Sequence, residues 1–197
     1  MRFPRFSACG LAAFCSLFLV SCGIFSDAEY TPVYTYDVGF PPESVVREAV
    51  PLDVEQFSSD ASARYKMTFR HGSRIYQDEY RKWAQSPASM MTKYLKMAFA
   101  SDAHKEKKPA LYSLSGVLLA FEADHDRHVC RLYVEYMIRR KTSDAVVKSG
   151  VVQIETPLRN DGDRGDEFAS AMSLAAAKLT ESLNQIVKSI PPEARKK

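Results

Sequence analysis

One short polar segment holds the residue types that could bind a metal ion. Asp124-His125-Asp126-Arg127-His128 combines two imidazoles with two carboxylates, and zinc needs three or four such donors that converge on one point. On an extended strand, however, His125 and His128 point to opposite faces, and the sequence contains no second cluster of donors. We therefore interpret the segment as a polar hairpin link and predict no metal site.

A second candidate is the segment 160–167, which is rich in Asp and Asn, as calcium loops are. It lacks the carboxylate spacing and the closing Glu of an EF-hand loop, so we expect a solvated loop that leads into a helix cap. The sequence also contains no G-x-S-x-G elbow, no glycine-rich phosphate loop and no H-E-x-x-H motif. We predict no catalytic residues and no cofactor, and that the protein is not an enzyme.

The four cysteines differ in what their thiols could do. Cys9 and Cys15 lie in an apolar N-terminal segment, Cys22 lies at its end, and only Cys130 lies in the body of the chain. Cys130 alternates with apolar residues, so we predict a buried core residue rather than a catalytic thiol. One internal cysteine cannot form an intramolecular disulfide, and the domain must therefore be held together by its apolar core.

Residues 1–21 have the layout of an export signal peptide, with Arg2 and Arg5 before an apolar run of about ten residues and no acidic residue. The run is too short for a membrane span, which needs roughly 20 apolar residues. Removing this segment lowers the Lys+Arg count from 27 to 25 against 24 Asp+Glu, and the formal net charge from +3 to +1. So small an excess of positive charge argues against nucleic-acid binding.

The residues Leu19-Val20-Ser21-Cys22 resemble the lipobox of bacterial lipoproteins, in which the cysteine thiol is acylated and the chain is cut just before it. Leu19 disfavours ordinary signal cleavage, which requires a small residue three positions before the cut. The alternative is a buried cysteine in a chain that is cut elsewhere. Acyl chains on Cys22 would attach the protein to a membrane without spanning it. In the resembled class, Gly23 rather than Asp after the cysteine implies sorting to the outer membrane, with the domain facing the periplasm.

The pattern of the mature chain predicts a lipid-anchored tether at 22–42, in which only residues 33–38 could form a strand, and a single domain at 43–190. Apolar alternation favours a strand in the first part of this domain, followed by a hairpin around a glycine. A Ser-Pro pair then opens a helix with an apolar stripe. These elements are expected at 50–57 (strand), 64–69 and 73–83 (hairpin around Gly72), and 87–103 (helix after Ser86-Pro87).

The second half of the domain predicts three β-strands in an antiparallel meander and a long amphipathic helix that begins near Asp166 as its N-cap. Pro191-Pro192 ends this helix, and a basic tail follows at 191–197. The expected fold is therefore α+β, a largely antiparallel sheet with two helices packed on one face, in the order strands, helix, three strands, helix. The three strands are expected at 111–123, 129–140 and 145–155.

The run Arg74-Ile75-Tyr76-Gln77-Asp78-Glu79-Tyr80-Arg81-Lys82-Trp83-Ala84-Gln85-Ser86-Pro87, followed by Met90-Met91 and Leu95, resembles the ABC-type transport auxiliary lipoproteins. In that family a tyrosine-bearing strand leads into Trp-Ala, then Pro and a helix, and an Ala-rich helix similar to Ala175–Ile186 closes the domain. The resemblance spans about residues 50–190. It implies a non-enzymatic docking component of an envelope lipid transport system, whose partners are an ABC transporter permease and ATPase and an MCE-type protein that bridges the periplasm.

Tyr76, Tyr80 and Trp83 are the candidate interface residues, although aromatic residues fill cores as readily as interfaces. The other interpretation is therefore that they form one buried strand face. Two alternative functions are an outer-membrane scaffold or assembly lipoprotein unrelated to transport, and a lipid-binding carrier, which needs a continuous apolar cavity. The transported substrate and the oligomeric state are left open, with a homo-oligomer as one option.

Overall fold

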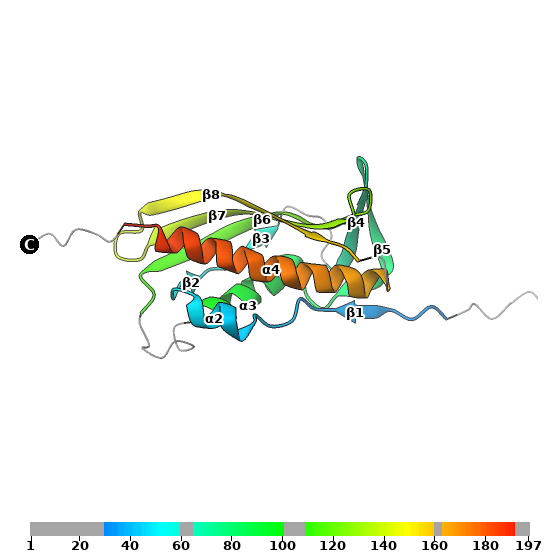
Figure 1. The fold of residues 1–197 in the computed structure, drawn as a ribbon, viewed down its shortest axis with the longest axis horizontal. Helices are drawn as coiled ribbons and strands as arrows, with labels where there is room; N and C mark the ends of the chain where they lie inside the picture. Colours follow the sequence, from blue (N-terminus) through cyan, green and yellow to red (C-terminus); the bar gives the residue numbers. More distant parts are fainter. Residues whose placement is uncertain (1–29, 60–64, 101–108, 160–162, 192–197) are drawn as a thin grey trace, which may run out of the picture. The chain divides into compact units, whose positions relative to one another are not determined.

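The computed structural model describes residues 30–59, 65–100, 109–159 and 163–191. Residues 33–197 form one compact unit, in whose described part eight strands make one sheet and three helices lie along one of its faces (Figure 1). The main strand order is β1-β5-β4-β6-β7-β8. The elements are β1 (Tyr34–Tyr36), α2 (Glu43–Glu48), β2 (Asp53–Val54), β3 (Ser58–Ser59), β4 (Lys66–His71), β5 (Arg74–Trp83), α3 (Pro87–Phe99), β6 (Tyr112–Asp124), β7 (Val129–Arg140), β8 (Val146–Pro157) and α4 (Arg164–Lys188).

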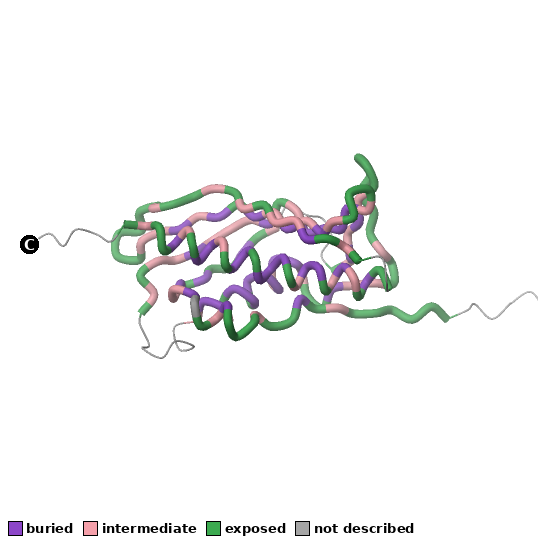
Figure 2. The backbone as a smooth tube through the Cα atoms, in the orientation of Figure 1, coloured by how far each residue is buried: buried purple, intermediate pink, exposed green. Residues whose placement is uncertain are grey.

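The predicted meander is confirmed, since β6 pairs with β7 and β7 pairs with β8, both antiparallel. In β7, buried residues alternate with more exposed ones (Figure 2). The buried side chains belong to the core beneath the helices, and those between them lie on the opposite face, called the outer face below. This alternation follows from the two-residue repeat of a strand. The buried residues are Cys130, Leu132, Val134, Tyr136 and Ile138.

Cys130 is a core residue, as predicted, with no exposed surface. Burial raises the pKa of its thiol to about 12, so the reactive thiolate is not populated at neutral pH. This thiol therefore serves packing and not nucleophilic chemistry.

The predicted hairpin is also confirmed, as β4 and β5 are antiparallel and meet at a turn in which Gly72 has a φ of 57°. Glycine adopts this left-handed conformation without steric cost. Close to this turn, at Phe69 and Arg70, β4 pairs with β6 in parallel. The tip of the hairpin projects away from the helical layer and is exposed (Figures 1 and 2).

Both predicted helices are present with different ends. Ser86 caps α3 by accepting a hydrogen bond from the Ser89 amide at 3.3 Å, but α3 ends at Phe99 because Ala100 leaves the helical conformation. The predicted N-cap Asp166 is wrong. Asp163, three residues earlier, caps α4 and accepts from the Gly165 amide at 2.7 Å. Its carboxylate is held in place by Arg81 of the sheet.

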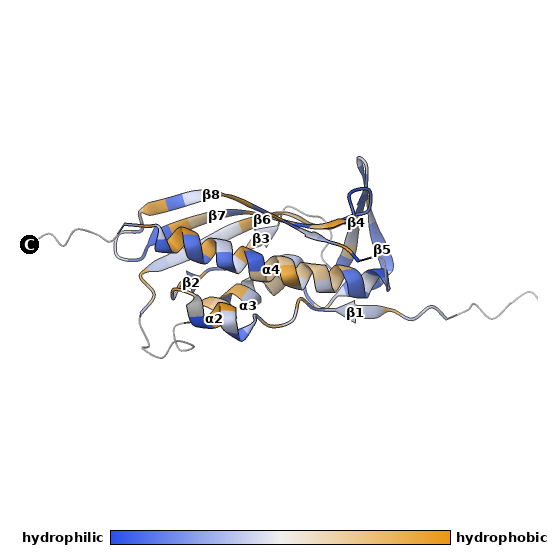
Figure 3. Cartoon of the chain, viewed as in Figure 1, coloured by the Kyte–Doolittle hydropathy of each residue, from blue (hydrophilic) through white to orange (hydrophobic). Residues whose placement is uncertain are grey.

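Figure 3 shows apolar and polar stripes along α4, as expected for a helix with one face on a sheet. The apolar stripe packs over β7 and β8. Its buried members include Phe168, Met172, Ala176, Leu179 and Leu183.

Two features differ from the expected fold: the segment at 50–57 and the number of helices. Within the predicted strand at 50–57 only β2 forms, and β3 follows directly after this range; each of the two pairs in parallel with β6. Between them the Phe57 amide donates to the Thr92 hydroxyl of α3 at 2.9 Å instead of to a strand. The α+β class and the largely antiparallel sheet are confirmed, whereas the expected pair of helices is wrong, because six residues at 43–48 form α2, which is too short to show a helical repeat.

Candidate interaction surface

The three aromatic candidates on β5 have different environments. Trp83 is 2% exposed and packs edge-on against Phe121 and Phe168 with ring centroids 5.2 Å apart in each pair. Tyr76 and Tyr80 are 42% and 47% exposed. Trp83 is thus a core residue, because the end of β5 runs beneath α4, whereas both tyrosines lie on the surface of the projecting hairpin.

Tyr76 is held in place by two other rings. Its ring stacks on Phe69, its partner on β4, with centroids 5.5 Å apart, and Phe69 in turn stacks on His125 at 5.2 Å. Burial, followed by the positive charge of Arg164, lowers the pKa of His125, so the imidazole is neutral at neutral pH. Tyr76 therefore presents an exposed ring with restricted freedom, which is the property of an aromatic anchor in a protein interface.

Tyr80 lies in an irregularity of β5. The pairing shifts from Thr68–Gln77 to Lys66–Lys82, so residues 78–81 bulge out of the ladder. The Asp78 carboxylate fixes the bulge by accepting from the Tyr80 and Arg81 amides at 2.8 and 3.0 Å. Bulges redirect side chains, and this one leaves the Tyr80 ring at the surface. The exposed side chains of Tyr76 and Tyr80 are called the hairpin surface below.

The base of the hairpin is tied to β1 and α4 through Asp163. Its carboxylate accepts from the Arg81 guanidinium at 2.5 and 3.1 Å, from the Tyr36 hydroxyl at 3.2 Å and from the Gly165 amide at 2.7 Å. The Arg81 hydrogen bond is the main reason that the pKa of Asp163 lies well below its ordinary value. Burial and this carboxylate raise the pKa of Tyr36 to about 12. This cluster joins residues from β1, β5 and the start of α4, and no local sequence pattern indicates it.

The tip of the hairpin is attached to the link between β6 and β7. The Asp126 carboxylate accepts from the Gly72 amide and contacts His71 Nδ1 at 2.5 Å. The segment 124–128 therefore connects two hairpins, and within the described ranges no group of His, Cys, Asp or Glu side chains is placed to hold a metal ion. Of the calcium-like segment, residues 160–162 lie outside the described part.

Buried carboxylates on the outer face are paired with arginines. Glu122 and Asp124 are 5% and 3% exposed, and Arg70 binds Glu122 through two hydrogen bonds of 2.6 and 3.1 Å. Arg131 lies 3.2 Å from Asp124 and 3.6 Å from both Glu122 and Glu155, the longer contacts being electrostatic rather than hydrogen bonds. Buried charges require such partners. The ion pairs therefore explain why these carboxylates are buried, and no ligand is needed to explain them.

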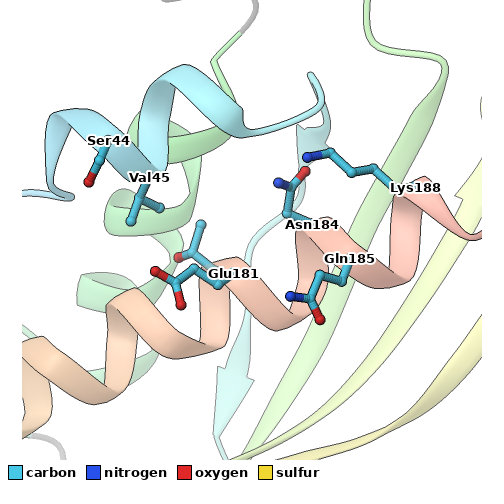
Figure 4. Close-up of a pocket in the computed structure, with 7 residues that line it drawn as sticks. Ser44, Val45, Glu181, Asn184, Gln185 and Lys188 are labelled. Atoms are coloured by element: carbon cyan, nitrogen blue, oxygen red, sulfur yellow. The ribbon is translucent and has the colours of Figure 1, made fainter.

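A polar groove lies between α2 and α4 (Figure 4). Asn184, which lines it, accepts a hydrogen bond from the Val50 amide at 2.9 Å and so holds the chain that follows α2. Packing therefore explains this buried amide without a ligand. The groove is also lined by Ser44, Val45, Glu181, Gln185 and Lys188.

The predicted lipidation site Cys22 lies outside the described residues. In the described part of the chain, no helix has both the length and the apolar character that a membrane crossing requires.

A family model described as the ABC-type transport auxiliary lipoprotein component matches residues 63–184. The chain belongs to this family. The matched region of this auxiliary lipoprotein includes the hairpin, α3, the meander and most of α4. The family is one of lipoproteins of the bacterial cell envelope, in agreement with the resemblance of residues 74–87.

Solved structures support the fold of the auxiliary lipoprotein. A Xanthomonas campestris protein of the DUF330 family is 16% identical with a TM-score of 0.62, and the match covers 79% of this chain and 95% of that one. An uncharacterized protein is 13% identical with a TM-score of 0.63, covering 80% and 99%. At these identities the likeness concerns the fold alone. No curated protein matches the sequence significantly.

Proposed function

We propose that this auxiliary lipoprotein is a non-enzymatic docking component of an MCE-type ABC lipid transport system at the outer membrane. The observation that carries the proposal is the family match over residues 63–184. In this proposal Cys22 is acylated and holds the domain on the periplasmic side of the membrane. An MCE-type protein is the direct partner, and it connects the domain to the permease and ATPase in the inner membrane.

We propose the hairpin surface as the docking surface. Exposed tyrosines that are held in place by their neighbours lose little conformational entropy on binding, and for this reason they are frequent at the centres of protein interfaces. Tyr76 is fixed by ring stacking, and Tyr80 by the bulge that Asp78 stabilises. The attachment of both ends of the hairpin, through Asp163 and Asp126, preserves the geometry of this surface.

The test is co-purification of the full-length chain from its own bacterial membranes in a gentle detergent. A photo-crosslinking residue at Tyr76 or Tyr80 is expected to capture the MCE-type protein, and the double variant Tyr76→Ala/Tyr80→Ala is expected to lose most of the co-purified transporter. Leu174→Ala on α4 is the matched control, since Leu174 is 48% exposed on the helical layer.

Recovery of neither an MCE-type protein nor an ABC component contradicts the proposal. Recovery of an outer-membrane assembly protein in their place favours the scaffold function. An equal loss in Leu174→Ala contradicts the hairpin surface but leaves the docking function.

A further inference from the structure

The outer face of the sheet has a hollow of about 570 Å³ between β1, β4 and β5. This volume lies within the range of about 300–1,000 Å³ that is usual for small-molecule sites. The hollow lies beside the bulge of β5, where the ladder between β4 and β5 is interrupted. It is lined by Thr35, Tyr65, Lys66, Gln77 and Lys82, and by the strand end at 83–84.

Two lysines face each other in this hollow. Lys66 and Lys82 are directly paired across β4 and β5, so both side chains point to the outer face, while Met67 and Trp83 beside them point into the core. Like charges directly opposite each other destabilise a strand pair. An anion between the two ammonium groups would relieve this repulsion.

The acidic groups nearby compensate only one of these charges. Lys66 Nζ lies 2.5 Å from Glu79 Oε1, and the Glu79 side chain is 66% exposed. Asp78 is engaged by Arg81 at 3.1 Å. Within the described ranges Lys82 has no acidic partner, so the described lining residues carry an excess positive charge.

The neutral groups around the lysines suit an oxyanion. Thr35 is paired with Lys82 on the neighbouring strand, so its hydroxyl lies on the same side of the sheet, and the exposed Gln77 supplies an amide donor. A phosphate group offers several strong acceptor oxygens to such a set of donors, and lysine binds phosphate as a point charge. Tyr65, which is 53% exposed, adds an aromatic ring with a polar end at the rim.

The position of the hollow along the chain favours a lipid source for the phosphate. Thr35 follows Cys22 by 13 residues, and a fully extended chain spans at most about 3.6 Å per residue, or about 47 Å in total. If Cys22 is anchored as proposed above, the hollow stays within this distance of the bilayer. Tyrosine and lysine side chains also suit the boundary between headgroups and water, since each has an apolar part and a polar tip.

We propose that this hollow binds the phosphate of an anionic phospholipid headgroup in the membrane to which the chain is anchored. The interaction would orient the outer face near β1 and β5 toward the membrane. This interaction is separate from docking to a transporter. The phosphate site itself does not depend on the proposed anchor at Cys22; only the assignment of the phosphate to a membrane lipid does.

The test uses the mature chain, residues 22–197, with Cys22→Ala so that no acyl chain contributes to binding. Co-sedimentation is measured with vesicles of phosphatidylcholine, with and without phosphatidylglycerol. Binding is expected only with phosphatidylglycerol. Lys82→Gln should weaken it about fivefold, as expected for one lysine near an anionic surface, and Glu79→Gln should strengthen it because it frees Lys66. Lys178→Gln, an exposed site on α4, is the control with the same change of charge.

Titration with glycerol phosphate, followed by NMR, separates the two sources of phosphate. Vesicle binding that depends on Lys82 without binding of the free compound supports a headgroup presented by a bilayer, and binding of both supports the same phosphate site. Equal binding by the Lys82→Gln and Lys178→Gln variants, or no vesicle binding at all, overturns the proposal. Because neither assay involves acylation or the transporter, this failure is distinguishable from failure of the docking function.

Discussion

Asp163 shows how much one side chain organises in this fold. It caps α4, binds Arg81 of β5 and accepts from the Tyr36 hydroxyl of β1. The sequence indicated a solvated loop leading into a helix cap here but placed the cap at Asp166, because several acidic residues at 161–167 satisfy the same capping rule. Only the tertiary contact with Arg81 distinguishes Asp163 from the others.

Asp163→Asn should lower the free energy of unfolding at neutral pH by about 0.5–1 kcal/mol, because it removes a partly exposed ion pair but keeps a capping oxygen. The folded-state pKa of Asp163 is depressed, so its contribution is complete above the unfolded-state pKa of about 4 and decreases as the pH falls below it. Urea unfolding at pH 7 and pH 3 measures this effect. An equally large difference between wild type and variant at both pH values contradicts the assignment.

Truncation should affect stability much more at Trp83 than at Tyr80. Trp83→Ala removes a buried ring and should cost about 3–5 kcal/mol, whereas Tyr80→Ala removes a surface ring and should change stability by less than about 0.5 kcal/mol. Chemical denaturation of both variants measures the difference. Similar losses in the two variants contradict the separation of core and surface along β5.

At the scale of elements, regular patterns were predictable and irregular ones were not. The alternation in β7, the turn at Gly72 and the Ser86 cap follow from local rules that the sequence displays. The bulge at 78–81 disrupts the two-residue repeat, so the aromatic pattern of β5 could not separate the buried Trp83 from the exposed tyrosines. The prediction of one strand at 50–57 was wrong for a related reason, because part of this backbone forms a hydrogen bond with α3 instead of with a strand.

Gly116 in β6 is required by close packing, as a glycine inside an apolar strand suggests. An added Cβ would lie 2.7 Å from the Glu135 carbonyl oxygen and 2.5 Å from the Phe57 ring. Gly116→Ala should therefore cost about 1–3 kcal/mol. Gly150→Ala is the matched control, since its nearest contact is the Tyr136 hydroxyl at 3.1 Å, and it should cost less. Thermal unfolding of both variants checks the order, and a larger loss for Gly150→Ala contradicts it.

For the complete fold, the order of elements and the family could be predicted from the sequence. The strand pairings that join the β4–β5 hairpin to β1 and β6 could not. The parallel pairing of β4 with β6 and of β1 with β5 links segments far apart in the chain, and such pairings leave no local pattern. The position of the hairpin surface depends on these two strand pairings. Its aromatic residues could be named from the sequence, but their exposure is set by the projection of the hairpin away from the helical layer.

In the proposed function an acylated Cys22 holds this domain beside a membrane that the chain does not cross. Mass spectrometry of the N-terminal peptide, isolated from the membranes of the native bacterium, tests it most directly. We predict a peptide that begins at Cys22 and carries a diacylglycerol on its thiol, and the Cys22→Ala variant should yield no acylated peptide. A mature chain that begins at another residue, or an unmodified Cys22 thiol in cells whose acylation enzymes are active, contradicts membrane attachment through Cys22.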